Sequence, residues 1–161
     1  MSLDLSAVGF TTLTFKFDYD WKTLATYALG IGAKKDELHV LYEGTEGGIC
    51  AIPTFAVVPA FDPVFETLKK TGGNLETIVH GGQIVRAHAA IPPKGTLSTT
   101  ATLTAIYDLK RFGQVYVETR TEIDGVLAFD TVWSIIFRSD GNFGGPRPAK
   151  ENPFDVAPSI P

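Results

Sequence analysis

The pattern of apolar and polar positions changes its period near the middle of the chain. In the first half, apolar residues recur at helical spacing over about residues 20–30 and again over residues 54–71. From residue 74 onward, apolar and polar residues alternate, which is the spacing of strands with one buried face. The sequence therefore predicts helices first and long strands afterwards.

Two short strands and one capped helix are expected before residue 45. Residues 12–17 alternate weakly, which suits a short edge strand, and residues 38–42 are a short apolar stretch that we expect to be extended. Between them, Asp20 is a good N-cap for the helix over residues 20–30, and Gly30 or Gly32 is a suitable stop.

Two prolines interrupt the second helical pattern. Pro59 and Pro63 both fall inside it, and a proline in a helix interior removes a hydrogen bond and clashes with the preceding turn. We therefore expect two helical pieces, the first capped by Thr54 and the second by Asp62, with Pro63 at its first position. Gly72 then ends the second piece.

Four longer strands are predicted within residues 74–91, 97–109, 114–123 and 126–137. The pair Asp124–Gly125 is a strong hairpin signal between the last two, and the continuous apolar character of the last strand predicts burial on both faces. The residues expected to share one face are Leu97, Thr99, Ala101, Leu103, Ala105 and Tyr107 in one strand, and Val115, Val117, Thr119, Thr121 and Ile123 in the next.

These elements predict an α+β fold in which an antiparallel sheet wraps around a central helix, the hot-dog architecture. Long twisted strands need one covered face, and only residues 54–71 are apolar enough to cover it. We expect a hot-dog domain over residues 1–145. Residues 146–161 are rich in proline and are expected to be a tail or linker.

Composition excludes several classes of function. The formal net charge is −4, from 14 basic and 18 acidic residues, so no basic footprint for nucleic acid is present. The single cysteine, Cys50, excludes an internal disulfide and a cysteine-based zinc site. No apolar run approaches the roughly 18 residues of a membrane span, and no secretory signal is visible.

The histidines offer no metal site. His80 and His88 are expected on one face of one strand, but eight residues of extended chain separate them by about 26 Å. The sequence around His80 is of more interest, because Gly81 and Gly82 weaken a strand unless a ligand or another backbone comes close. A simple β-bulge explains the same glycines.

Two further segments are candidates for a binding site. Tyr42 and Glu43 precede a glycine-rich loop, where Glu43 would orient a substrate or handle a proton, or would be a solvated turn residue. Thr54 and Phe55 follow Pro53 at a helix start, where backbone N–H groups would hold a thioester carbonyl or a phosphate oxygen. Capping by Thr54 alone explains that segment nearly as well.

Five short segments occur together in a fixed order: residues 27–33 (YALGIGA), 41–44 (LYEG), 52–55 (IPTF), 79–83 (VHGGQ) and 141–145 (GNFGG). In this order the chain resembles the N-terminal half of 2-enoyl-CoA hydratase type 2, the MaoC-like double hot-dog module of peroxisomal multifunctional enzyme type 2 and its bacterial relatives. The resemblance implies hydration of trans-2-enoyl-CoA to (3R)-hydroxyacyl-CoA by the complete enzyme.

The resemblance also implies that the catalytic residues lie elsewhere. In the family, an Asp and a His in a D-x-N-P-x-H motif of the second half carry the reaction. Here Asn152 and Pro153 are followed by Phe154 and Asp155, and no histidine follows His88. We therefore expect a non-catalytic, acyl-CoA-binding half that is inactive alone, with no catalytic residue and no metal of its own.

The resemblance points to Glu43, because the family's Leu-Tyr-Glu-Gly glutamate is implicated in activity. It puts the His80 strand in doubt, because Gly82 replaces the glutamate that usually follows His-Gly. The residues expected to contact substrate are Tyr42, Glu43, Thr54, Phe55, His80 and Gly81.

The expected partners are an acyl-CoA thioester and a catalytic hot-dog domain or subunit, with neither nucleic acid nor a membrane involved. Coenzyme A is expected only as part of the substrate, with no other cofactor. The chain would be a truncated fragment of a longer enzyme or a complete subunit, and a homodimer when isolated. We expect a cytoplasmic protein in a bacterium and a peroxisomal one in a eukaryote.

Two other functions remain open. One is a standalone acyl-CoA thioesterase in which Glu43 or His80 activates water. The other is a scaffold module without a ligand.

Overall fold

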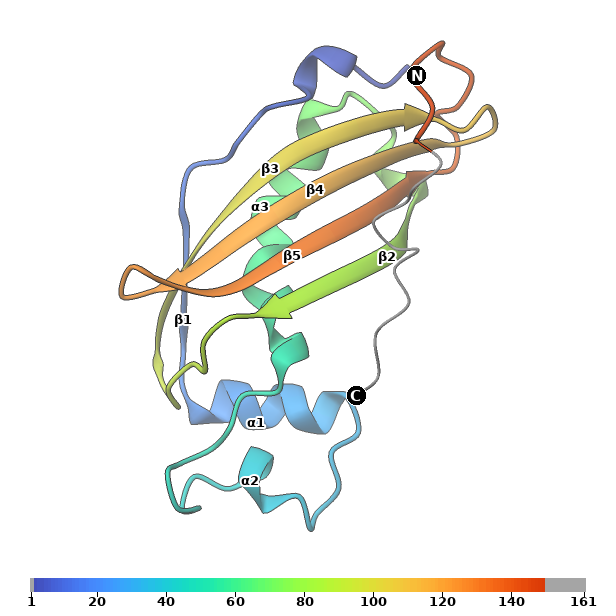
Figure 1. The fold of residues 1–161 in the computed structure, drawn as a ribbon. Coiled ribbons are helices and arrows are strands. Elements are labelled where there is room, and N and C mark those ends of the chain that lie inside the picture. The colour runs from blue at the N-terminus through green and yellow to red at the C-terminus, as the bar shows by residue number, and fades with distance from the viewer. Residues whose placement is uncertain (1, 150–161) are drawn as a thin grey trace.

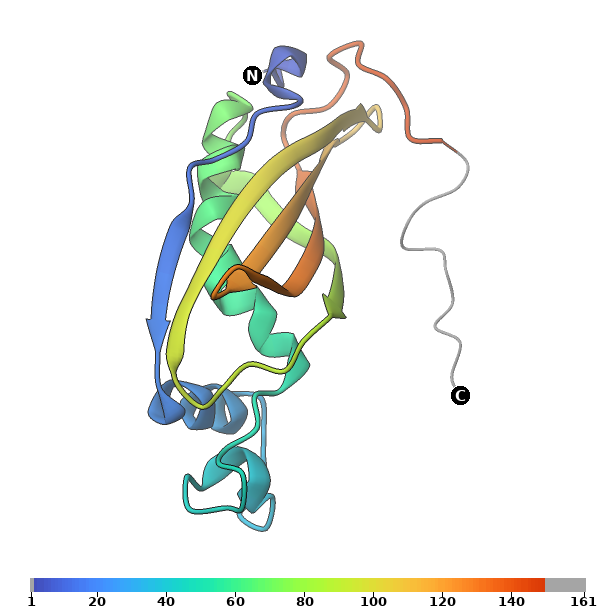
Figure 2. The ribbon, with the colours of Figure 1, turned by 60° about the vertical axis from the view of Figure 1, so that its left-hand side comes forward.

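The structure, a computed structural model, describes residues 2–149 as a five-stranded antiparallel sheet that curls around one long helix (Figures 1 and 2). The strand order is β1-β3-β4-β5-β2, so β1 and β2 form the two edges. This is the hot-dog fold that the sequence predicts. The strands are β1 (Phe15–Tyr19), β2 (Ile78–Ala87), β3 (Gly95–Asp108), β4 (Gly113–Ile123) and β5 (Val126–Phe137).

The helices lie on one face of the sheet and at one of its ends. The long helix α3 packs against β3 and β4, while α1 and α2 lie below the sheet in Figure 1. Three short 3₁₀ turns complete the described chain. The bounds are α1 (Trp21–Gly30), α2 (Leu38–Leu41), α3 (Val57–Lys70), η1 (Leu5–Ala7), η2 (Pro53–Ala56) and η3 (Leu75–Thr77).

Local sequence signals explain several of these elements. Asp20 caps α1 as expected, and with Thr23 it forms a reciprocal capping box. The hairpin turn falls at Asp124 and Gly125, whose φ angles of 49° and 78° suit the left-handed conformation that such turns require. The early edge strand is also confirmed, although β1 begins at Phe15 and ends at Tyr19.

The expectation of two helical pieces divided by prolines is wrong. Helix α3 is continuous through Pro63, and neither Thr54 nor Asp62 begins a helix as its cap. Pro59 lies in the first turn of α3, where a backbone N–H would have no partner within the helix, so the N–H that proline lacks is not missed there. Pro63 does cost one hydrogen bond, but its ring is buried with the helix face that packs on the sheet. Tertiary packing therefore overrides the local signal.

The segment over residues 38–42 is also not extended. Residues 38–41 form the single turn α2, and the Tyr42 N–H donates to the Leu38 carbonyl. The Cys50 N–H donates to the His39 carbonyl at 2.8 Å, which fixes the turn against the chain that leads into η2. Such long-range support is invisible to a local pattern.

Two β-bulges change which residues of β2 and β3 lie on the core face of the sheet, compared with the prediction. In β3 the register changes between Leu103 and Ala105, so Ile106 rather than Ala105 is buried in the core. In β2 it changes between His80 and Gly82, so His80 and His88 lie on opposite faces rather than sharing one.

The core beneath α3 consists of two apolar clusters with a row of threonines between them. One cluster contains Trp133 and Phe137, and the other contains Phe55 and Phe129. The hydroxyls are buried and paired: Thr99 with Thr121 at 3.0 Å, Thr119 with Thr131 at 2.6 Å, and the Trp133 indole N–H with Thr131 at 2.7 Å.

Candidate functional site

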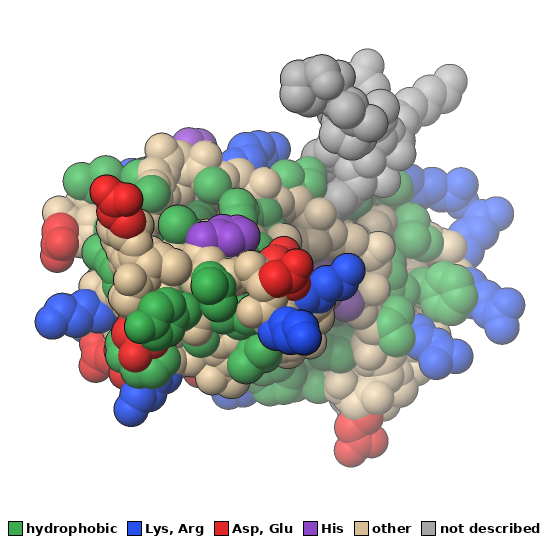
Figure 3. Space-filling model, turned by 90° about the horizontal axis from the view of Figure 1, so that it is seen from below, with side chains coloured by type: hydrophobic (Ala, Val, Ile, Leu, Met, Phe, Trp, Pro, Cys, Tyr) green, Lys and Arg blue, Asp and Glu red, His purple; other side chains and the backbone are tan. Residues whose placement is uncertain are grey.

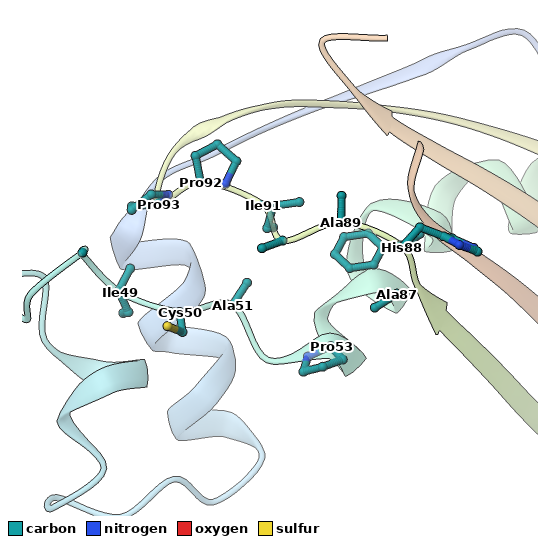
Figure 4. A pocket seen from close by; sticks show the side chains of 13 residues that line it. Ile49, Cys50, Ala51, Pro53, Ala87, His88, Ala89, Ile91, Pro92 and Pro93 are labelled. Atoms are coloured by element: carbon teal, nitrogen blue, oxygen red, sulfur yellow. The ribbon is translucent and has the colours of Figure 1, made fainter. Parts of the chain in front are cut away.

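A cleft lies at the lower end of the sheet, between two irregular segments. One wall consists of residues from 47–53, at the start of η2, and the other of residues from 87–93, at the end of β2 (Figure 4). Phe129 of β5 also lines the cleft. The volume is about 680 Å³, within the range of pockets that hold small ligands.

The walls of this cleft are mostly aliphatic. Ile49 and Ile91 are buried beside it, and Ala51 lies between Cys50 and Pro53 along one wall. Cys50 is a free, exposed thiol. None of the lining residues is an aspartate or glutamate. The cleft is therefore suited to an apolar group.

Hydrogen bonds from the rigid fold hold one wall in place. The His88 N–H donates to the Ala128 carbonyl of β5 at 2.8 Å, and the Tyr19 hydroxyl donates to the Pro92 carbonyl at 2.9 Å. Burial raises the pKa of Tyr19 to about 12, and the Asp124 carboxylate contributes in the same direction. Tyr19 thus stays a neutral donor at physiological pH.

An ion cluster lies beside the cleft but on the other face of the sheet. Asp130 accepts from Arg86 at 2.8 Å and from the His88 imidazole. Partial burial disfavours the charge of Asp130, but these two hydrogen bonds outweigh it and keep the pKa below its usual range. Because Asp130 follows Phe129 in the strand, its side chain points away from the cleft, and Figure 4 shows the His88 ring turned away as well.

Tyr42 and Glu43 do not line the cleft. Both side chains are exposed where α2 ends, in the turn that precedes the glycine-rich loop. The turn is closed by Thr45, whose hydroxyl donates to the Tyr42 and Gly48 carbonyls at 2.9 Å. Among residues 2–149, no residue forms a hydrogen bond or ion pair with the Glu43 side chain that would serve proton transfer.

Thr54 and Phe55 differ from each other in burial. Thr54 is exposed in η2, and no side chain caps the turn there. Phe55 is only 1% exposed, and its ring packs at an edge against Tyr27 with centroids 5.5 Å apart. Phe55 is therefore a core residue that supports the cleft from behind and does not line it.

His80 and Gly81 lie at the far end of β2, beside α3. The imidazole stacks on Trp133 with centroids 5.1 Å apart and 12° between the ring planes. His80 Nε2 is 3.0 Å from the Gly82 carbonyl, which can only accept, so Nε2 is the protonated nitrogen. A smaller cavity of about 150 Å³ opens here between α3 and β2, next to Phe61 and Phe65.

The six predicted residues therefore fall in three separate places, and none lines the larger cleft. The residues that do line it, such as Ile49, Ala51 and Ile91, have no motif. The sequence feature that could have indicated this cleft is the composition of two segments between regular elements, which are rich in small and aliphatic residues and in prolines. Composition alone does not predict that the two segments lie opposite each other.

The surface around this end of the molecule carries charges of both signs. Figure 3 views it from below and shows basic and acidic side chains scattered around exposed apolar ones. The exposed apolar side chains of α1, α2 and their connection are Leu29, Ile31, Leu38 and Tyr42. Among residues 2–149, no helix is long and apolar enough to cross a membrane, and no cluster of three potential metal ligands occurs.

Comparison with known proteins identifies related sequences and folds. The 3-hydroxyacyl-thioester dehydratase Y of Mycobacterium tuberculosis is 30% identical over 100% of this chain and 56% of its own length. Full-length peroxisomal multifunctional enzyme type 2 of Drosophila melanogaster superimposes with a TM-score of 0.68 at 28% identity, over 82% of this chain and 24% of that one. The chain thus spans about half or less of these two relatives.

A third likeness concerns the fold alone. A chain of the C-terminally truncated HadBC complex, a (3R)-hydroxyacyl-ACP dehydratase of M. tuberculosis, superimposes with a TM-score of 0.70 at 12% identity. That match covers 84% of this chain and 99% of that one.

The family described as the MFE-2 hydratase 2 N-terminal domain matches residues 17–139. The protein therefore belongs to this family of hot-dog hydratases and dehydratases.

Proposed function

We propose that this chain is the non-catalytic, acyl-CoA-binding half of a MaoC-like, (R)-specific enoyl-CoA hydratase or dehydratase. The fatty acyl chain would lie in the cleft between residues 47–53 and 87–93, and coenzyme A would enter only as part of the substrate. The supporting observation is a cleft of about 680 Å³ with apolar walls and, among residues 2–149, no aspartate or glutamate in its lining. We expect the protein in the cytoplasm of a bacterium or the peroxisome of a eukaryote.

The chemistry of hydration explains why such a cleft needs a second domain. A base must take a proton from water and an acid must protonate the substrate carbon. The imidazole nearest the cleft, His88, is turned to the opposite face and hydrogen-bonded to Asp130. Apolar walls bind and orient the acyl chain but leave proton transfer to residues of the other half.

The single cysteine provides a direct test of binding. Cys50 is exposed on the cleft wall, so a bound acyl chain should slow its alkylation by a maleimide at least several-fold, whereas S-methyl-coenzyme A, which has neither an acyl chain nor a free thiol, should not. A matched control carries Cys50→Ser and Val126→Cys, which moves the thiol to the exposed β4–β5 hairpin. Protection of both thiols, or of neither, would contradict binding in this cleft.

A thermal shift separates this function from a scaffold role. A ligand that binds only the folded state raises its stability by RT ln(1 + [L]/Kd). Saturating acyl-CoA should therefore raise the melting temperature of the chain. An unchanged melting temperature would favour a module without a ligand.

Activity assays test the non-catalytic role. The purified chain should not hydrate crotonyl-CoA, and adding a catalytic hot-dog half should restore hydration. Turnover by the chain alone would contradict the proposal. The thioesterase alternative requires Glu43 or His80 to activate water, yet neither lines the cleft. Thioester hydrolysis that disappears in Glu43→Gln would support that alternative.

The edge strand β2 is the surface proposed for the other half. Within residues 2–149, β2 pairs only with β5, so its second edge is free. Beside this edge, Phe61 of α3 is 59% exposed next to the small cavity at His80. A free strand edge with an adjacent apolar surface favours pairing with another sheet. In isolation, a second copy of the chain would take this place.

Light scattering tests whether the β2 edge is the interface between two copies of the chain. The isolated chain should be a dimer, and Phe61→Asp should shift it toward the monomer because a carboxylate would be buried in the interface. Val126→Asp is the matched control, since Val126 is 58% exposed but lies on the β4–β5 hairpin. A monomeric wild type, or equal dissociation of both variants, would contradict the β2 interface.

A further inference from the structure

At one end of the apolar cleft, its two walls come into contact. Gly48 lies between Gly47 and Ile49, which line the wall that leads into η2, and Pro93 lines the wall that follows β2. A Cβ atom built on Gly48 would be only 2.8 Å from Pro93 Cγ, so the backbone of one wall touches the ring of the other. No larger side chain fits at residue 48 without moving the walls apart.

The conformation of the glycine supports the same conclusion. Gly48 has a φ of +82°, a left-handed conformation that side chains rarely adopt. The neighbouring turn is held by the Thr45 hydroxyl, which donates to the Gly48 carbonyl at 2.9 Å. Gly48 is therefore fixed against Pro93 by its own loop.

The opposite end of the cleft is open. Figure 4 shows the cleft running from Ile49 and Pro93 at one end to Pro53, Ala87 and His88 at the other. Ile49 is buried and Pro93 is half-buried, whereas the last three residues are exposed. An acyl chain would enter from the η2 and β2 end, with its methyl terminus directed at the contact between Gly48 and Pro93.

We propose that the contact between Gly48 and Pro93 is the end wall that sets the longest acyl chain the cleft accepts. This inference rests on the proposed acyl-binding function and adds the specificity-determining residues. Each methylene that enters the cleft should tighten binding about fourfold, which corresponds to about 0.8 kcal/mol of buried apolar surface. Once the methyl terminus meets the wall, further carbons stay in solvent and affinity should stop rising.

The test measures dissociation constants for saturated acyl-CoAs from butanoyl to hexadecanoyl by calorimetry. In the wild type, affinity should rise with chain length and then reach a plateau. Pro93→Ala removes the ring atoms that touch Gly48, so the plateau should move by about two carbons, with roughly fifteenfold tighter binding of chains just beyond the wild-type limit. Pro148→Ala, a matched proline substitution outside the cleft, should leave the plateau in place.

A second variant separates this inference from the proposed function. Ala51→Leu fills the middle of the cleft and should weaken every chain that passes it. If Ala51→Leu weakens binding but Pro93→Ala leaves the plateau unchanged, the end wall is overturned and acyl binding stands. If Ala51→Leu has no effect, or if no acyl-CoA binds the wild type, both are overturned. An affinity that rises to the longest chain without a plateau also overturns the end wall.

Discussion

The imidazole of His80 lies flat on the indole of Trp133, with centroids 5.1 Å apart and 12° between the planes. Three features produce this arrangement. The bulge between His80 and Gly82 turns His80 toward α3, the Gly82 carbonyl holds Nε2, and Thr131 accepts from the indole N–H. The stack therefore links the edge strand β2 to the threonine row of the core.

Gly81 should be required for this bulge. In Gly81→Ala, the new Cβ would lie 3.0 Å from Ile136 Cγ1 and 3.2 Å from Ser134 Oγ, so we expect a loss of about 1–3 kcal/mol in the free energy of unfolding. Urea denaturation measures it. Gly30→Ala is the control, because no neighbour lies within 4 Å of a Cβ there. An equal loss in both variants would contradict a steric role for Gly81.

Thr131 should stabilise the core through its hydroxyl. Thr131→Val keeps the shape but leaves the buried indole N–H of Trp133 without an acceptor, which costs about 1–3 kcal/mol. Thr131→Ser restores the acceptor and should recover much of the loss. Chemical denaturation of the three proteins tests this, with Thr100→Val as a control on the other face of the sheet. A serine variant as unstable as the valine variant would argue for packing instead.

Tyr19 should make the protein sensitive to alkaline pH. Its pKa is about 12 in the folded state against 10.0 ordinarily, so between these values the unfolded chain releases the proton first. The contribution of Tyr19 to stability is therefore complete below pH 10 and is lost as pH rises toward 12. Melting temperatures across this range should fall more steeply for the wild type than for Tyr19→Phe. The exposed Tyr42→Phe control should retain the wild-type slope.

Asp130 should stabilise the folded protein at neutral pH and lose this effect in acid. Its pKa lies below the usual 3.8, so its contribution is present above that value and disappears as pH falls through the folded-state pKa. At neutral pH, Asp130→Asn should cost up to about 1 kcal/mol, because the ion pair with Arg86 is partly exposed. Urea unfolding of the wild type and of Asp130→Asn, at neutral pH and at a pH below the folded-state pKa of Asp130, measures the difference in the free energy of unfolding. A difference that persists in strong acid would contradict this explanation, and Asp36→Asn serves as the control.

Local signals were sufficient for much of the fold. A capping residue acts on the next three residues, so Asp20 predicts its helix without tertiary information. The alternation from Val115 to Ile123 is an equally local record of one buried face, and all five inward positions are buried. The proposed division at residues 145 and 146 stays a prediction, and residues 150–161 lie outside the described part of the chain.

The candidate site could not be predicted in the same way. Glu43, Thr54 and His80 stand out because they carry chemistry, yet the structure puts them in three separate places. The cleft is formed by Ile49, Ile91 and their neighbours, which are separated by about forty positions and carry no motif. Their meeting depends on where α2, η2 and β2 end in space.

The sequence by itself determined the capped helix after Asp20, the long antiparallel strands with most of their inward faces, and the family resemblance, because each depends on neighbouring residues or on short motifs. Only the tertiary structure decided the bulge that separates the faces of His80 and His88, the passage of α3 through Pro63, and the contact between Gly48 and Pro93. The reason is physical: each of these features is stabilised by packing between segments far apart in the chain, and local periodicity contains no information about such contacts.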